Sequence, residues 1–436
     1  MNTTRIHRML AAAFAGALAA GVVGAPDARA QSVESALAPV RGTFEPALLP
    51  PPEQPFLVPD APQDAEEHVQ ATSPWFTFKL GLVLIADYTA FSQDANSLAQ
   101  VGRQRNQWDD RAARLMFHGT LGTRYKVGYL LAGEYKGFES EPEQTWQLTD
   151  ASLTFPLGSP ATRLTVGKTK ETFAYEMVGD AANLPPQERV LNPFFVSRNF
   201  GVKLSRVLGA DHRMTASAGV FNNWWVHGES LKDSGTDATA RVTGLLWDRR
   251  DGKSFLHLGV AGRYFGADNN VLRYKARPES NVTDNYLDTG NLSSDHAWHL
   301  GLEALWNEGP YSVLAEYHRA SVASAGAGNP GFYGYYVAGS WVLTGETRPY
   351  DRTVGYARRV MPRGRWGAPE LVARFSHDDL DDGVVHGGTF DKTYLGLNWW
   401  ATRRWKFGVG WGHTWLDRFG KTGVTDSIQT RFQWIL

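Results

Sequence analysis

The chain has 436 residues, a formal net charge of −1 and no cysteine, which excludes a disulfide framework and thiol chemistry. Only one run, Met9 to Gly24, is apolar enough for a membrane helix, so a bundle of membrane helices is excluded too. The 45 glycines, 16 tryptophans and 16 tyrosines leave a soluble all-β protein or a transmembrane barrel, and they favour the barrel.

The N-terminus has the pattern of an export signal. The apolar run follows Arg5 and Arg8 and precedes the small-residue motif Ala28-Arg29-Ala30. We therefore predict a cleaved signal peptide over residues 1–30, with Gln31 as the first mature residue. Residues 31–74 are predicted to be a proline-rich linker, because nine of the 22 prolines lie between Ala36 and Pro74 and no strand pattern appears there.

Residues 75–436 alternate apolar and polar positions, with the period of two that a β-strand requires. The set that opposes the apolar positions consists of glycine, serine, threonine, glutamine and scattered arginine, which suits a wet lumen. Short connections such as Gly158 to Ala161 alternate with longer ones, including Lys170 to Arg198, Asp379 to Phe390 and Asp417 to Val424. This rhythm predicts an all-β, transmembrane antiparallel β-barrel of about 16 strands, with short periplasmic turns.

In one stretch of the sequence, a predicted membrane strand is followed directly by an arginine-rich segment. From Phe332, FYGYYVAGSWVLT alternates as a membrane strand, and the following Gly345 to Gly367 carries six arginines against two acids. This long segment lies on the side of the short turns, and Val271 to Pro278 is predicted to belong to a loop. An apolar strand beside a cationic segment indicates a wall and a charged passage.

Several segments, in order, resemble one family, the phosphate-selective porins of the O and P type. The matching segments are Asp150 to Glu176, Phe255 to Phe265, Arg273 to Ser280, Leu287 to Gly290, Leu300 to Ala320, GYYVAGSWVLTGETRPYDR (Gly334 to Arg352) and Tyr394 to Trp400. The resemblance implies a trimeric, sixteen-stranded bacterial outer-membrane porin that passes anions, with phosphate as its characteristic solute.

The charges that line a pore decide its selectivity. Counting strand residues of inward parity gives eleven basic residues against four acidic ones, which favours inorganic anions of the phosphate type. The segment from Lys170 to Arg198 is expected to fold into the lumen, anchored by Phe173, Tyr175, Phe194 and Phe195. The candidate pore-lining and anion-binding residues are Arg114, Lys170, Arg189, Arg198, Lys203, Arg241, Arg263, Arg374 and Arg431.

Other functions stay open at this point. Gln187 to Asn199 is poor in basic residues for a strongly phosphate-selective porin, so a general small-solute porin is an alternative. A barrel enzyme would need a Ser-His pair near the rim, and no spacing points to one. A structural barrel with a plugged lumen is the third. We expect no catalytic residue, metal or cofactor, no nucleic-acid partner, and contact with outer-membrane lipid and lipopolysaccharide.

Overall fold

The computed structural model describes residues 70–135, 146–222, 234–249 and 252–436. The predicted signal peptide (1–30) and the linker up to residue 69 lie outside the described residues. Within the described part, no helix combines the length and the apolar character needed to cross a membrane.

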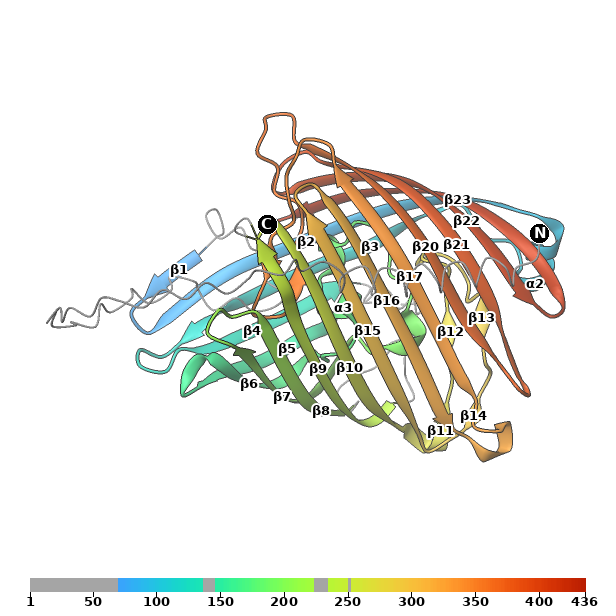
Figure 1. Ribbon diagram of the computed structural model, residues 1–436, viewed down its shortest axis with the longest axis horizontal. Helices are drawn as coiled ribbons and strands as arrows, with labels where there is room; N and C mark the ends of the chain where they lie inside the picture. The colour runs from blue at the N-terminus through green and yellow to red at the C-terminus, as the bar shows by residue number, and fades with distance from the viewer. Residues whose placement is uncertain (1–69, 136–145, 223–233, 250–251) are drawn as a thin grey trace, which may run out of the picture. The chain divides into compact units, whose positions relative to one another are not determined.

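The chain from Phe76 onward forms a closed antiparallel barrel, as predicted (Figure 1). The main sheet has seventeen strands, and setting aside the short strand β1 leaves sixteen in the barrel, which closes where β23 pairs with β2. The barrel strands are β2 (Phe76–Gln93), β3 (Gln107–Leu121), β4 (Val127–Tyr135), β5 (Trp146–Leu157), β6 (Ser159–Lys170), β7 (Arg198–Leu208), β8 (Met214–Asn222), β9 (Ser234–Arg249), β10 (Ser254–Ala267), β15 (His296–Glu308), β16 (Tyr311–Ala323), β17 (Gly331–Val342), β20 (Ala368–Asp382), β21 (Val385–Trp400), β22 (Trp405–Arg418) and β23 (Lys421–Ile435).

Strand β1 (Gln70–Ser73) lies in the stretch that the sequence assigned to the linker. It pairs with Phe76–Lys79 at the base of β2. The opposite edge of β2 is paired with β3, and on the edge that β1 occupies β2 pairs with β23 only from Val83 onward, so the base of β2 extends below β23. Pairing with β1 satisfies backbone groups that would otherwise form an open sheet edge.

The predicted alternation holds along the wall. On β17, Phe332 and Tyr336 are fully buried toward the interior, whereas Val337 and Trp341 on the other face are exposed. On β23, Ile428 and Phe432 are exposed and Arg431 is buried. The outward positions are therefore apolar, as a barrel in lipid requires, whereas the inward positions carry polar residues together with aromatic residues such as Phe332 that pack inside the barrel.

Two predicted long loops are wrong. The segments 379–390 and 417–424 are mostly strand, and the turns between them contain only Gly383–Val384 and Phe419–Gly420. Phe419 and Gly420 have φ of 56° and 67°, the left-handed values that a two-residue type I′ turn needs. The polar composition of segments 379–390 and 417–424 resembles that of loops, but the hydrogen bonds between strands continue through both segments.

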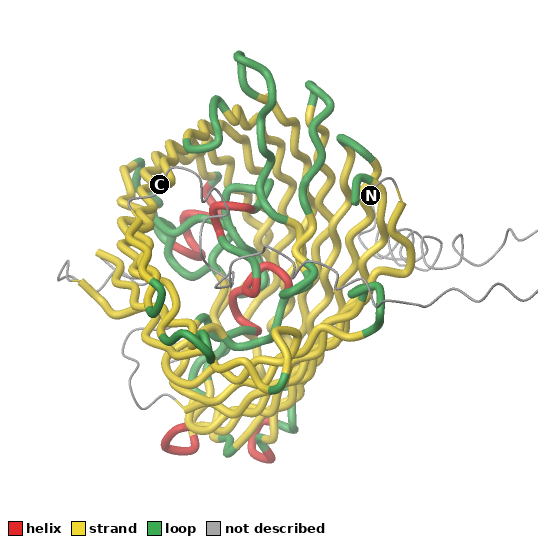
Figure 2. The backbone as a smooth tube through the Cα atoms, turned by 90° about the vertical axis from the view of Figure 1, so that its left-hand side faces the viewer, coloured by secondary structure: helices red, strands yellow, loops and turns green. Residues whose placement is uncertain are grey.

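Three inserts enter the barrel, and Figure 2 shows helices and loops inside the ring of strands. The lumen loop (residues 171–197) contains α3 (Tyr175–Val178), η2 (Ala181–Asn183) and η3 (Asn192–Phe194). The external insert (268–295) contains η5 (Asp268–Asn270), β11 (Val271–Leu272), β12 (Lys275–Ala276), β13 (Leu287–Asp288) and β14 (Leu292–Ser293). The periplasmic insert (343–367) contains β18 (Tyr350–Asp351) and β19 (Tyr356–Ala357).

The remaining elements lie at the rim. Helix α2 (Ala95–Val101) follows β2, and η6 (Ala325–Ala327) follows β16. The sequence correctly left Val271 to Pro278 out of the wall, because its two short strands pair only within the external insert. The periplasmic insert is the long connection predicted on the side of the short turns.

Candidate functional site

The lumen loop folds inward because its aromatic residues find an apolar surface there. Phe173, Tyr175, Phe194 and Phe195 are all at most 3% exposed, as the sequence predicted. Phe194 lies beside Tyr274 of the external insert, with ring centroids 6.5 Å apart, and Tyr274 contacts the ring of Phe332 on β17 at 5.3 Å. This packing fills the part of the lumen next to β10 and β15–β17 with apolar side chains.

A glycine on β17 makes room for this packing. A Cβ on Gly334 would lie 2.9 Å from side-chain atoms of Leu191 and Phe194, and 2.0 Å from Oδ1 of Asp378. These separations are shorter than van der Waals contact. Gly334 therefore lets the lumen loop lie directly against the wall.

A carboxylate on the wall holds the start of α3. The backbone N–H groups of Tyr175 and Glu176 donate to Glu316 at 2.5 and 3.1 Å, and the Tyr336 hydroxyl donates to it at 2.7 Å. A carboxylate suits the exposed N–H groups at the first turn of a helix. Glu316 is therefore an anchor of the lumen loop.

Two predicted anion-binding arginines clamp the inserts. Arg374 contacts Glu176 of the lumen loop at 3.0 Å and Glu279 of the external insert at 2.5 Å. Arg431 contacts Asp87 on β2 at 2.6 Å and Glu188 of the lumen loop at 2.8 Å. Each guanidinium thus joins two carboxylates from different segments.

Glu188 also forms an ion pair with a second arginine, Arg111 on β3. Burial opposes the ionisation of Glu188, but the adjacent Arg111 and Arg431 guanidiniums outweigh it and lower the pKa of Glu188 below its ordinary value. This carboxylate therefore stays charged and keeps the lumen loop tied to β3 and β23.

Four further candidate anion-binding residues form ion pairs with carboxylates of the barrel strands or of the adjoining start of the lumen loop. Arg114 contacts Glu134 at 2.6 Å, Arg198 contacts Asp150 at 2.9 Å, and Arg241 contacts Glu303 at 2.6 Å. Arg263 lies between Glu171 at 2.9 Å and Asp237 at 2.8 Å. Arg114, Arg241 and Arg263 are buried, in agreement with the inward parity of their positions, but the charges of all four arginines are compensated in place.

The other three candidates contact backbone carbonyls. Lys170 donates to the carbonyl of Gly179 at 3.0 Å, Arg189 donates to that of Glu176 at 2.7 Å, and Lys203 donates to that of Lys170 at 3.0 Å. Carbonyl oxygens orient a cation without cancelling its charge. These three residues lie on or beside the first half of the lumen loop.

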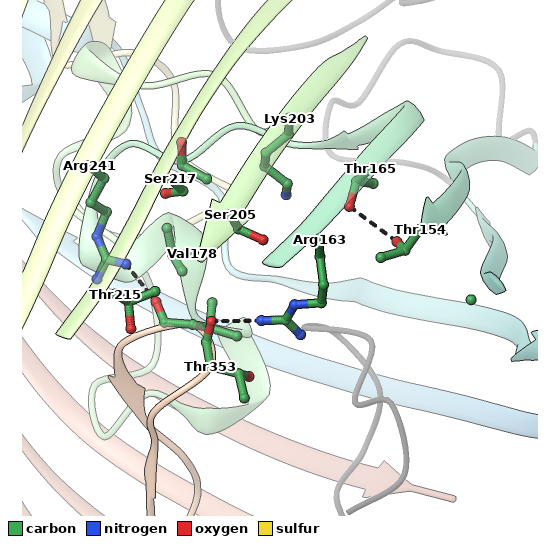
Figure 3. A pocket seen from close by; sticks show the side chains of 13 residues that line it. Thr154, Arg163, Thr165, Val178, Lys203, Ser205, Thr215, Ser217, Arg241 and Thr353 are labelled. Atoms are coloured by element: carbon green, nitrogen blue, oxygen red, sulfur yellow. Dashed lines mark hydrogen bonds between the residues drawn. The ribbon is translucent and has the colours of Figure 1, made fainter. Parts of the chain in front are cut away.

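The first cavity lies against β4–β9 and has an open volume of about 590 Å³. Its lining includes Arg163, Lys203 and Arg241 and contains no carboxylate. Figure 3 shows these side chains projecting from neighbouring strands toward Thr353 of the periplasmic insert. The hydroxyl groups around them belong to Thr154, Thr165, Thr172, Ser205, Thr215, Ser217 and Thr353.

Arg163 is the clearest cation of this cavity. Its Nη2 donates to the carbonyl of Thr353 at 3.0 Å, and no carboxylate among the described residues forms an ion pair with it. The inward parity of Arg163 was evident from the sequence, but nothing distinguished it there from the arginines that are paired.

A second cavity of about 330 Å³ lies against β2–β4 and the first turns of the lumen loop. Five cations line it, namely Arg111, Arg114, Lys170, Arg189 and Arg198, together with the carboxylates Glu134 and Asp180. The two cavities flank the segment 170–181. Both cavities lie along the part of the wall between β2 and β9.

Sequence reasoning missed Arg111. Strict alternation from Arg114 would turn Arg111 outward, yet its side chain is buried. The register changes here, since Ile85 pairs with Ala112 whereas Asp87 pairs with Asp109, which leaves one extra residue on β3. Such a β-bulge reverses the parity beyond it.

Three of the six arginines in the periplasmic insert form ion pairs. Arg348 pairs with Glu370, Arg352 with Asp248 and Arg358 with Asp351. The insert meets the lumen loop inside the barrel, where the Ala357 N–H donates to the Tyr175 hydroxyl at 2.8 Å. It narrows the lumen from the periplasmic end instead of forming a cationic lining of its own.

Known proteins share this sequence and architecture. The chain is 23% identical over 405 residues to Porin O of Pseudomonas aeruginosa, which covers 84% of this chain and 90% of that protein. The barrel is similar to the outer membrane channel DcaP of Acinetobacter baumannii (TM-score 0.53, 14% identity, 84% of this chain and 99% of that one). It is also similar to an anion-selective porin from Comamonas acidovorans (TM-score 0.54, 11% identity, 82% and 100%).

The profile of one family matches residues 78–434, which is nearly the whole barrel from β2 to β23. The members of this family are porins, that is, channels of the outer membrane and not enzymes. The chain belongs to the phosphate-selective porin O and P family.

Proposed function

We propose that this porin passively conducts small inorganic anions, with phosphate-type oxyanions as its preferred solutes. The observation that carries the proposal is the first cavity, where Arg163 projects into the lumen beside Lys203 and several hydroxyl groups, and where no carboxylate lies among the lining residues. Arg241 lines the cavity too, but its charge is paired with Glu303. Guanidinium and ammonium groups beside hydroxyls can replace the hydration shell of an oxyanion. The family description and the named relative support the same class of solute.

The anion preference of this pore depends on where the inward cations lie relative to carboxylates, more than on how many inward cations there are. The inserts contribute four carboxylates that pair with wall arginines: Glu171 with Arg263, Glu176 and Glu279 with Arg374, and Glu188 with Arg111 and Arg431. The excess of inward cations predicted along the strands is therefore largely neutralised near those inserts. Arg163 on β6 forms no ion pair with a carboxylate among the described residues, so its positive charge persists in the first cavity, and an anion would pass beside it.

The test is the reversal potential in a potassium chloride gradient across a planar bilayer. We expect the wild type to prefer chloride over potassium, and an Arg163→Gln, Lys203→Gln double variant to lose roughly fivefold per charge in permeability ratio, as for a charge near 4 Å in water. Arg206→Gln is the matched control, because Arg206 lies on the same strand as Lys203 and points outward. Cation preference in the wild type would refute the proposal.

Phosphate specificity has its own readout. If the cavities bind phosphate, micromolar phosphate will block the chloride current, and the block will weaken in the Arg163→Gln, Lys203→Gln variant. Block only at millimolar concentration would instead identify a general anion porin. We further infer that the porin forms a homotrimer. We also infer that the signal peptide is cleaved after Ala30, and N-terminal sequencing of the purified protein would test this cleavage site.

A further inference from the structure

We propose that the periplasmic edge of β20–β23 binds an anionic phospholipid of the inner leaflet, with its phosphate held by Arg365 and Arg403. We call this surface the aromatic–arginine patch: Arg365, Trp366, Trp399, Arg403, Trp405, Phe407 and Phe432. It lies outside the lumen, and the proposed conduction of anions does not involve it.

The aromatic part is a contiguous outward-facing cluster. The ring centroids of Trp399 and Phe407 are 5.5 Å apart, as are those of Phe407 and Phe432, and those of Trp405 and Phe432 are 5.1 Å apart. All four side chains are more than one-third exposed. Their strand neighbours Asn398, Lys406 and Arg431 face the lumen, so the cluster faces lipid.

Trp366 extends this cluster to the membrane boundary. It is 74% exposed, and its carbonyl accepts a hydrogen bond of 2.8 Å from the indole of Trp399. It therefore lies against the outer surface of the barrel, at the end where the short turns are. Tryptophan prefers this level of a bilayer, because its ring is apolar and its N–H remains near water.

Two arginines border the cluster. The Arg365 guanidinium lies 5.0 Å from the centre of the Trp366 ring, and Arg403 is exposed in the turn between β21 and β22. Neither forms an ion pair with a carboxylate within the described residues. Stacking on tryptophan orients a guanidinium and leaves its N–H groups available for phosphate oxygens.

The charge along these strands identifies the leaflet. At their opposite, external ends three exposed acids, Asp381, Asp382 and Asp417, outnumber the exposed Lys421, whereas Arg365 and Arg403 mark the periplasmic ends. A phosphodiester headgroup is thus attracted at one membrane surface and repelled at the other. Acyl chains below such a headgroup would lie on Trp399, Phe407 and Phe432.

Native mass spectrometry of the purified full-length porin tests the proposal, with phosphatidylglycerol or phosphatidylcholine of the same acyl chains added to the detergent. We expect the wild type to retain phosphatidylglycerol preferentially. An Arg365→Gln, Arg403→Gln variant should lose that preference by roughly thirtyfold, the effect of two surface cations near a headgroup. An Arg103→Gln, Arg105→Gln variant is the matched control, because both residues are exposed in the external segment between β2 and β3.

The result that would overturn the proposal is equal retention of phosphatidylglycerol by the patch variant and the wild type. Displacement of the lipid by millimolar inorganic phosphate would also overturn it, because the site would then recognise a free ion. If the patch variant dissociated into single subunits without any change in lipid preference, the patch would be a contact between copies. An Arg365→Lys, Arg403→Lys variant should keep most of the preference, which separates loss of charge from misfolding.

Discussion

At the scale of single residues, Gly334 controls how closely the lumen loop approaches the wall. A methyl group there would approach Leu191 and Phe194 to 2.9 Å. We expect Gly334→Ala to displace the loop, raise single-channel conductance and cost about 1–3 kcal/mol of unfolding free energy, as overpacking does.

The matched control for this change is Gly339→Ala on the same strand. Its nearest neighbour would be the Ser312 carbonyl oxygen at 4.0 Å, so the added methyl group meets no obstacle. Conductance in bilayers and urea unfolding in lipid vesicles give the two readouts. Unchanged conductance in both variants would show that the loop does not define the narrowest part of the pore.

Arg374 provides a second prediction, because the sequence assigned it to anion binding and the structure pairs it with Glu176 and Glu279. Arg374→Gln removes the guanidinium from two buried carboxylates, of which Glu279 keeps another ion-pair partner, Lys392 at 3.6 Å. We expect a loss of about 3–5 kcal/mol in unfolding free energy, measured by urea titration in lipid vesicles. Arg206→Gln, an exposed arginine, should change stability little.

A different result would reverse this assignment. If Arg374→Gln left stability intact and lowered the permeability for anions, Arg374 would be a solute-binding residue, as its inward parity alone predicted. Unfolding free energy and anion permeability together therefore distinguish an arginine that holds the inserts in place from one that binds the passing solute.

At the scale of elements, the lumen loop behaves as one unit held by Glu316. The Tyr175 N–H donates to one oxygen of Glu316, and the Glu176 N–H and the Tyr336 hydroxyl donate to the other. An amide keeps only one of these oxygens and places an NH2 group at the other, so at least one backbone N–H of the loop loses its acceptor. We expect Glu316→Gln to weaken the anchorage by about 1–3 kcal/mol and to increase the fluctuations of the open-channel current.

Ser340→Ala is the control for the anchor. Ser340 also faces the lumen, but its hydroxyl bonds to Ser312 of the neighbouring strand and not to the loop. Steady currents in Glu316→Gln, equal to those of Ser340→Ala, would mean that apolar packing alone fixes the loop.

At the scale of the whole molecule, the barrel has two different ends. The chain contains no cysteine, so single cysteines can be introduced at exposed sites without a background. We expect a membrane-impermeant maleimide to label Ala99→Cys on intact cells and to leave Ser159→Cys unlabelled until the outer membrane is permeabilised. Ala99 lies in α2 at the end with the long connections, and Ser159 lies at a short turn. Labelling of Ser159→Cys on intact cells would invert the topology.

The sequence by itself determined the wall. Period-two alternation is a local property of an extended chain, so the faces of β17 and β23 could be assigned without knowing any tertiary contact. The inward direction of Arg114, Arg241, Arg263, Arg374 and Arg431 follows from the same rule. The aromatic residues of the lumen loop indicated its inward fold, because such side chains seek an apolar surface.

Only the tertiary structure decided what each inward charge does. Arg374 meets Glu176 across 198 residues of sequence, and Arg431 meets Glu188 across 243. No local pattern encodes such partners, since they depend on where the inserts lie inside the closed barrel. The bulge that turns Arg111 inward is likewise a matter of strand register, which pairing between strands fixes. Closure of the barrel thus converts a row of similar arginines into ion-paired clamps, and it leaves Arg163 facing a cavity whose lining contains no carboxylate.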